Sequence, residues 1–98
     1  MDLTGAWLVR ANLTRANLDQ TNLADAWLIG ANLTRAYLVL ANLTGAHLIG
    51  ANLTGAMLDG ASLTRAHVTR DALTEEQLAE ASNVELIEWE EEGQPPAD

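Results

Sequence analysis

The 98-residue sequence contains no cysteine, no phenylalanine and no lysine. Without cysteine, the chain has no disulfide framework and no thiolate for catalysis or metal binding. The residues around Leu3 do not resemble a signal peptide, and the longest apolar run, Ala36 to Ala41, is too short to cross a bilayer. We therefore expect one small domain that is cytoplasmic, of bacterial type and without a membrane segment.

Basic residues are few, and their placement changes the meaning of the net charge of -9. Residues 1–70 contain five bases and four acids, which gives +1, whereas residues 71–98 contain ten acids and no base, which gives -10. The acidity therefore belongs to the C-terminal segment alone, and the rest of the chain is close to neutral.

A five-residue repeat occupies most of the chain. Leucine recurs at every fifth position from Leu3 to Leu63, and Val68 and Leu73 continue the series. Alanine stands two residues before almost every one of them, so that the unit reads Ala-x-Leu-x-x. The exceptions to the alanine are Met1, Thr21 and Asp71.

This period excludes one continuous helix and one continuous strand. Five residues turn an α-helix by about 140° beyond a full turn, so that the leucines would form no stripe. In a strand, an odd period would send successive leucines to opposite faces. Within one unit, however, alanine and leucine are two apart and share a face, so a regular corner in each unit keeps both inside a coil.

Glycine marks many of these corners, because it adopts a positive φ at little cost. Six glycines stand two residues after a leucine: Gly5, Gly30, Gly45, Gly50, Gly55 and Gly60. The other corners carry Arg, Gln, Asp or Leu, for which a positive φ is unfavourable. We therefore expect corners of two turn types.

Tandem Ala-Asn-Leu-Thr-Gly units, as in residues 41–45 and 51–55, resemble the pentapeptide repeat family. The resemblance covers roughly residues 2–73. It implies an all-β solenoid, a right-handed quadrilateral β-helix with four pentapeptides per coil. Residues 1–73 would then form about four coils.

The C-terminal end carries a capping signal. Thr74 and Gln77 fit the two ends of a capping box, which predicts a short helix from about Glu75 to Ala81. We expect residues 74–89 to form this helical cap and a docked segment, with 84–89 either a strand or a second helical turn. Residues 90–98 are expected to be an acidic disordered tail. At the other end Met1 stands in mid-repeat, so either the first coil is open and pairs with another copy or the chain is a fragment of a longer protein.

Residues twenty apart should lie one above another on one side of the coil. One such column contains Trp7, Trp27, His47 and His67, and a neighbouring column contains Val9, Ile29 and Ile49. Tryptophan is enriched in binding hot spots, and an exposed apolar strip is unusual on a monomer. The alternative is that the indoles only cover backbone. The candidate interface is Trp7, Val9, Trp27, Ile29, His47 and Ile49.

Residues suited to catalysis are scarce. Ser62 and Ser82 are the only serines, and Ser62 belongs to a different side from His47, with no third group to orient the pair. His47 and His67 should stack, but we expect no third metal ligand near them. Every corner glycine is explained by its turn rather than by a phosphate-binding loop. We therefore expect no enzyme, no cofactor, no metal and no small-molecule substrate.

These observations favour a non-enzymatic interaction or scaffold module that acts through flat faces on a protein partner or on a second copy. The resemblance implies one alternative, because quinolone-resistance proteins of the family resemble DNA and bind type II topoisomerases. The near-neutral repeat region argues against a DNA mimic, and no direct binding of nucleic acid is expected. A further alternative is an accessory domain of a larger protein.

Overall fold

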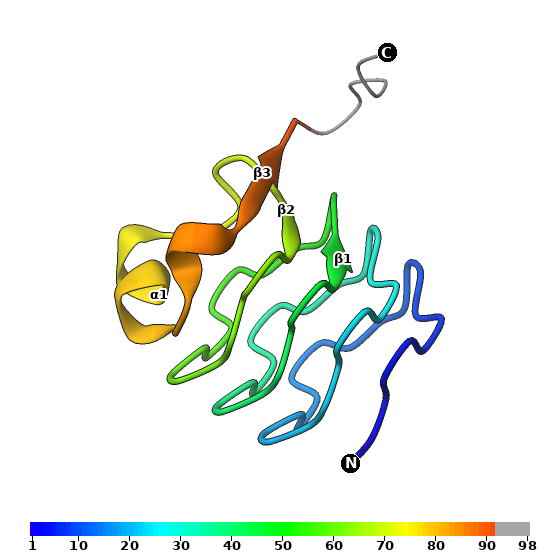
Figure 1. Ribbon diagram of the computed structural model, residues 1–98. Coiled ribbons are helices and arrows are strands. Elements are labelled where there is room, and N and C mark those ends of the chain that lie inside the picture. Colours follow the sequence, from blue (N-terminus) through cyan, green and yellow to red (C-terminus); the bar gives the residue numbers. More distant parts are fainter. Residues whose placement is uncertain (92–98) are drawn as a thin grey trace.

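Parallel pairing between residues twenty positions apart organises the chain (Figure 1). The computed structural model describes residues 1–91. Bridges join Trp7 to Trp27 and Trp27 to His47, and equivalent bridges follow on the other sides. Backbone hydrogen bonds accompany each bridge, for example from the Leu8 N–H to the Trp27 carbonyl at 2.8 Å. The chain thus advances by one strand spacing every twenty residues, which makes it a β-helix.

Three short strands lie next to one another towards the C-terminal end. They are β1 (His47–Leu48), β2 (His67–Thr69) and β3 (Glu88–Glu90), and they form a parallel sheet in the order β1-β2-β3. The register places His67 opposite His47 on one side and opposite Glu88 on the other. Strand β3 therefore continues the pairing of the coils with a segment that is not part of the repeat.

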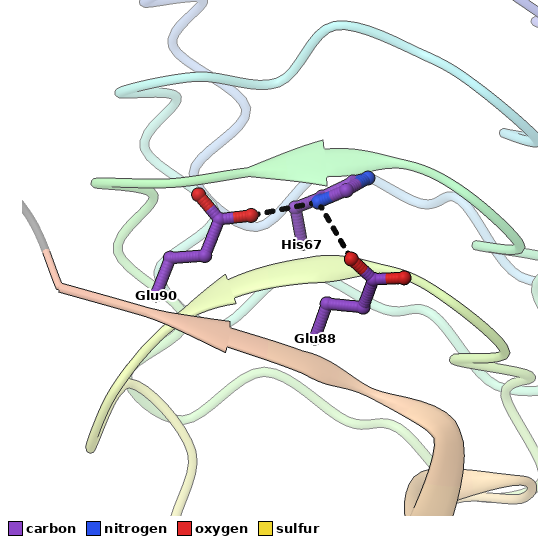
Figure 2. Close-up of side chains that lie close together, drawn as sticks. All are labelled: His67, Glu88 and Glu90. Carbon is purple, nitrogen blue, oxygen red and sulfur yellow. Dashed lines mark hydrogen bonds and ion pairs between the residues drawn. The ribbon is translucent and has the colours of Figure 1, made fainter. Parts of the chain in front are cut away.

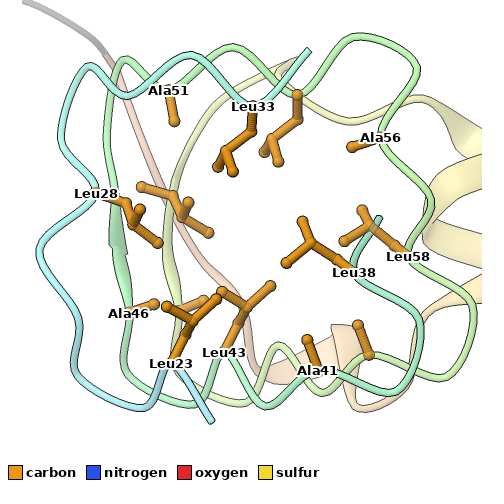
Figure 3. Close-up of a cluster of buried hydrophobic side chains, with 14 of the residues drawn as sticks. Leu23, Leu28, Leu33, Leu38, Ala41, Leu43, Ala46, Ala51, Ala56 and Leu58 are labelled. Carbon is orange, nitrogen blue, oxygen red and sulfur yellow. The ribbon is translucent and has the colours of Figure 1, made fainter. Parts of the chain in front are cut away.

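Leucine and alanine fill the inside of the coils. Each leucine at the centre of a repeat unit from Leu18 to Leu63 is buried, and so is Val68, whereas Leu40, which stands at a corner, is exposed. Figure 3 shows these side chains pointing into the space that the chain encloses. Leu3, Leu8 and Leu13 in the first coil are only partly buried but pack against the same core. The inward alternation of alanine and leucine is thus confirmed.

All corners from residue 5 to residue 65 adopt one conformation, so the prediction of two turn types is wrong. Every fifth residue in this range has a positive φ, between 57° and 76°, whether it is glycine or not. At Arg10, the N–H donates to the Ile29 carbonyl at 2.9 Å, and the next residue closes the turn onto the Leu8 carbonyl at 3.0 Å. A left-handed non-glycine residue costs about 1–2 kcal/mol, and the hydrogen bonds on both sides of the corner hold it there.

The predicted cap is present. Helix α1 (Glu75–Glu80) begins after a capping box in which Thr74 and Gln77 bond each other's backbone N–H groups. The buried Gln77 amide also donates to the carbonyls of Leu53 and Ala56, at 2.9 and 3.0 Å. These bonds satisfy two carbonyls of the repeat region and fix the helix on it.

Residues 84–89, for which the sequence predicted either a strand or a helical turn, contain both. A 3-10 turn, η1 (Val84–Leu86), precedes β3. Strand β3 extends to Glu90, one residue into the range predicted as a tail, and residues 92–98 of that range lie outside the described residues. Within residues 1–91, no helix has the length and hydropathy needed to cross a membrane.

The buried leucines predict that a charge at an inward position prevents folding, whereas the same charge at the neighbouring outward position does not. Leu33→Asp should abolish folding, because a carboxylate would be buried without a partner, at a cost above the roughly 2–5 kcal/mol of truncating a buried leucine. Asn32→Asp places the same charge one residue away on the exposed side and keeps the oxygen that accepts from the Thr34 N–H. Circular dichroism should show native signal for Asn32→Asp only. A folded Leu33→Asp would contradict the inward assignment.

The corners predict two separable penalties. At Gly5 (φ 68°) an added Cβ would meet no atom within 4 Å, so Gly5→Ala should cost only the backbone strain, about 1 kcal/mol. At Gly45 (φ 68°) the Cβ would also meet the end of the exposed Asp25 side chain, which must rotate away, so Gly45→Ala should cost slightly more than Gly5→Ala. Urea denaturation of both variants measures the difference. Unchanged stability in both would show that these corners do not require a positive φ.

Candidate functional site

Four aromatic rings form a column along one side of the β-helix. Trp7 and Trp27 have ring centroids 5.7 Å apart and planes tilted by 38°, while Trp27 lies on His47 at 3.8 Å and 5°. His47 and His67 are stacked at 5.1 Å and 2°, which confirms their predicted stacking. Each ring comes from the residue before an inward leucine or, for His67, before the inward Val68, so the backbone register points all four outward in line.

Aliphatic side chains form the next column on the same side. The Arg10 N–H bonds the Ile29 carbonyl and the Gly30 N–H bonds the Ile49 carbonyl, both at 2.9 Å, which places Val9, Ile29 and Ile49 one above another. The six predicted interface residues therefore lie on two adjacent columns. We call them the aromatic strip: Trp7, Val9, Trp27, Ile29, His47 and Ile49.

The two indoles differ in how much they are covered. Trp7 keeps 72% of its surface exposed, while Trp27, between Trp7 and His47, keeps 37%. Ile29 is also exposed, and Val9, His47 and Ile49 are half-buried. Trp27 thus packs within the column, whereas Trp7 presents most of its ring to the surroundings.

Packing changes the acid–base behaviour of His47. Burial lowers its pKa below the usual 6.5, and the neighbouring His67 lowers it further. The carboxylates of Asp25 and Glu90 act in the opposite direction but do not prevail.

Two carboxylates reach the end of the ring column, and sequence reasoning missed them. Glu90 Oε2 lies 2.8 Å and Glu88 Oε1 lies 3.7 Å from the same atom, His67 Nδ1 (Figure 2). The expectation that no third ligand lies near the histidines is therefore wrong. The alternation Glu88-Trp89-Glu90, with an acid on each side of a residue packed against the core, was the available signal.

Ser62 lies on a different column from His47. It is bridged to Asn42 and Ser82, and its hydroxyl accepts a hydrogen bond from the Asn83 amide at 3.2 Å. No hydrogen bond joins it to His47 among residues 1–91. The structure therefore does not bring the serine and the histidine together.

Comparison with known proteins identifies the repeat. The family model described as pentapeptide repeats (8 copies) matches residues 2–35 and 36–70, more than half of the chain. The chain belongs to the pentapeptide repeat family. None of the curated proteins compared with it matches.

Three solved structures of pentapeptide repeat proteins are similar to this chain. One is a protein of the Arabidopsis thaliana thylakoid lumen, with 34% identity, a TM-score of 0.68, and coverage of 69% of this chain and 47% of that one. Another, from Nostoc PCC 7120, has 26% identity, a TM-score of 0.30, and coverage of 91% and 84%. The third is HetL, involved in the regulation of heterocyst differentiation in Nostoc sp. PCC 7120, with 27% identity, a TM-score of 0.22, and coverage of 72% and 54%. The chain thus spans about half the length of the Arabidopsis protein.

The lowered pKa of His47 predicts a pH-dependent stability of this pentapeptide repeat chain. The imidazole of His47 binds a proton more readily in the unfolded chain than in the folded one. The neutral His47 therefore contributes to the free energy of unfolding above pH 6.5, and this contribution is lost as the pH falls through the lower pKa of the folded state. Urea denaturation between pH 8 and pH 5 should show a smaller loss of stability for His47→Gln than for the wild type. Identical pH profiles would exclude this role.

Proposed function

We propose that this pentapeptide repeat chain is a non-enzymatic protein-interaction or scaffold module, and that the aromatic strip is its interface. The observation that carries the proposal is Trp7, whose ring is held by Trp27 on one face and is 72% exposed. Large exposed aromatic surface is rare on monomers, and tryptophan is the residue type most enriched in binding hot spots. The partner would be a second copy or another protein with a flat apolar face.

The strip is suited to binding because it is already ordered. Its two columns are fixed by the backbone hydrogen bonds between successive coils, so a partner would order few side chains on binding. Neighbouring indole and imidazole rings also restrict each other's rotation. Such a surface loses little conformational entropy when it is covered.

Polar side chains elsewhere on the coil are already bonded to their own backbone. The Asn12, Asn32 and Asn52 side chains accept hydrogen bonds from the N–H groups of residues two positions later, at 3.2, 3.1 and 3.0 Å. This row therefore has fewer free acceptors to offer a partner. The contrast supports the aromatic strip as the binding side.

For the architecture, we propose the right-handed quadrilateral form with about four coils. Corners every five residues and pairing every twenty support four sides per coil. Membership of the family supports the same form. We further propose that the protein acts in the cytoplasm, without binding nucleic acid, membrane or a small-molecule substrate.

Exposed arginines favour a protein partner over the DNA-mimic alternative. Arg10, Arg15, Arg35 and Arg65 stand at exposed corners of the repeat region. Their positive charges interrupt the continuous negative surface that imitation of a DNA backbone requires. The observation therefore supports the interaction module.

Removing the two indoles should abolish self-association without unfolding the chain. Trp7→Ser/Trp27→Ser leaves the inward leucines intact, and loss of hot-spot tryptophans costs about 2 kcal/mol each, roughly thirtyfold in affinity. A matched control is Tyr37→Ser/Met57→Ser, which removes a bridged pair of exposed apolar residues from another side. Sedimentation at several concentrations should show a monomer for the tryptophan variant and an oligomer for the control.

Three results would contradict parts of this proposal. An oligomer that survives the tryptophan change would place self-association elsewhere, for example at the first coil. A wild type that stays monomeric at high concentration would exclude self-association through the strip and leave only a different protein as partner. Inhibition of a type II topoisomerase that DNA competes away would favour the DNA mimic.

A further inference from the structure

We propose that His67, Glu88 and Glu90 form a binding site for a divalent transition-metal ion that fastens β3 to β2. One ligand atom from each residue lies within 4.8 Å of the other two. Both carboxylates approach the same imidazole atom, His67 Nδ1, at 2.8 Å for Glu90 and 3.7 Å for Glu88. This inference goes beyond the proposed interface and does not depend on it.

The distances suit coordination of a small cation. Ligand atoms about 2.1 Å from a metal lie about 3.0 Å apart in octahedral and about 3.4 Å apart in tetrahedral geometry. The two separations from Nδ1, 2.8 and 3.7 Å, lie on either side of this range. Rotation of the glutamate side chains, which are exposed and have three rotatable bonds, would bring both separations into the range for coordination.

The backbone fixes where the ligands stand. His67 pairs with Glu88 across the β2–β3 register, and Glu90 follows two residues later on the same outward face of β3. The residue between the two acids, Trp89, packs against the core, so β3 cannot rotate without losing that contact. Figure 2 shows the two glutamates rising from β3, with the dashed lines from both ending on the same ring nitrogen of His67.

The imidazole is held in place from its other side. His47 stacks on the His67 ring at 5.1 Å, nearly parallel, which limits rotation of the ring and keeps Nδ1 directed towards β3. His47 is therefore a positioning residue and not a ligand. For coordination His67 would keep its hydrogen on Nε2, which leaves the Nδ1 lone pair free for the metal.

Charge at the cluster also favours a cation. The two glutamates place two negative charges next to one imidazole. A neutral imidazole has at most one hydrogen on Nδ1, so it cannot donate a full hydrogen bond to each carboxylate. Within residues 1–91, His67 is the only ion-pair partner that the structure gives to either carboxylate, while the nearby Arg70 contacts Glu91 at 3.8 Å. A divalent ion would neutralise both carboxylates at once.

The donor set selects the class of ion. One imidazole and two carboxylates suit zinc, cobalt, nickel, iron or manganese, whereas calcium and magnesium prefer oxygen ligands alone. An ion bound here would bridge the last strand of the repeat region and the C-terminal strand. It would stabilise the folded chain, because the three ligands come together only when β3 is docked.

Isothermal titration of the untagged chain with zinc chloride tests the site, because a polyhistidine tag would bind the same ion. We expect one zinc ion per chain, a higher melting temperature with zinc, and reversal of that shift by a chelator. His67→Gln and Glu90→Gln should each weaken zinc binding about tenfold or more and remove the shift. Glu85→Gln, which changes an exposed acid in η1, should behave as the wild type.

Several outcomes would overturn the site. Equal weakening by Glu85→Gln, or calcium binding as tight as zinc binding and unaffected by His67→Gln, would show general attraction of cations to an acidic segment. Zinc affinity unchanged in all ligand variants that are folded by circular dichroism would exclude the three residues as ligands. Trp7→Ser, which leaves Trp27 stacked on His47, should bind zinc as the wild type does, so failure of the interface and failure of the metal site can be told apart.

Discussion

Backbone hydrogen bonds between successive coils are the constraint on which the rest of the structure depends. They run from residues such as Leu8 to the carbonyl of a residue nineteen positions later, and the same step recurs on each side. This ladder sets the spacing of the inward leucines and holds the corners in a backbone conformation that arginine, glutamine or leucine would not adopt alone. It also brings four rings into one column. As in other solenoids, each coil depends only on its neighbours.

The repeat region could be predicted closely because its information is local and redundant. A five-residue period indicated the inward alanine and leucine, and the twenty-residue coil that the family resemblance supplied aligned His47 with His67. The corners were predicted less well, since glycine preference suggested two kinds of turn where the structure has one. Residue preferences describe isolated turns. At Arg10 and Leu40 these preferences are outweighed by the hydrogen bonds that their N–H groups donate to Ile29 and Asp59 in the next coil.

The end of the chain could be predicted only in part. The local sequence motif of Thr74 and Gln77 predicted the capping box, and the structure contains it. The pairing of β3 with β2 joins residues 21 positions apart across a segment without repeats, so no period revealed it. For this reason the carboxylates beside His67 were missed, although the ring itself was placed correctly. A local sequence motif is enough to predict the cap, but only the folded chain shows that the segment after it pairs with β2.

The twenty-residue step has a consequence for how such a chain can change its length. Insertion or deletion of one pentapeptide would keep alanine and leucine inside, since every unit has the same inward pattern. It would, however, move every later residue to the next side of the coil. If the change lay between Trp27 and His47, Trp7 and Trp27 would no longer share a side with His47 and His67. The core therefore tolerates changes of five residues, whereas a continuous column of rings tolerates only changes of twenty.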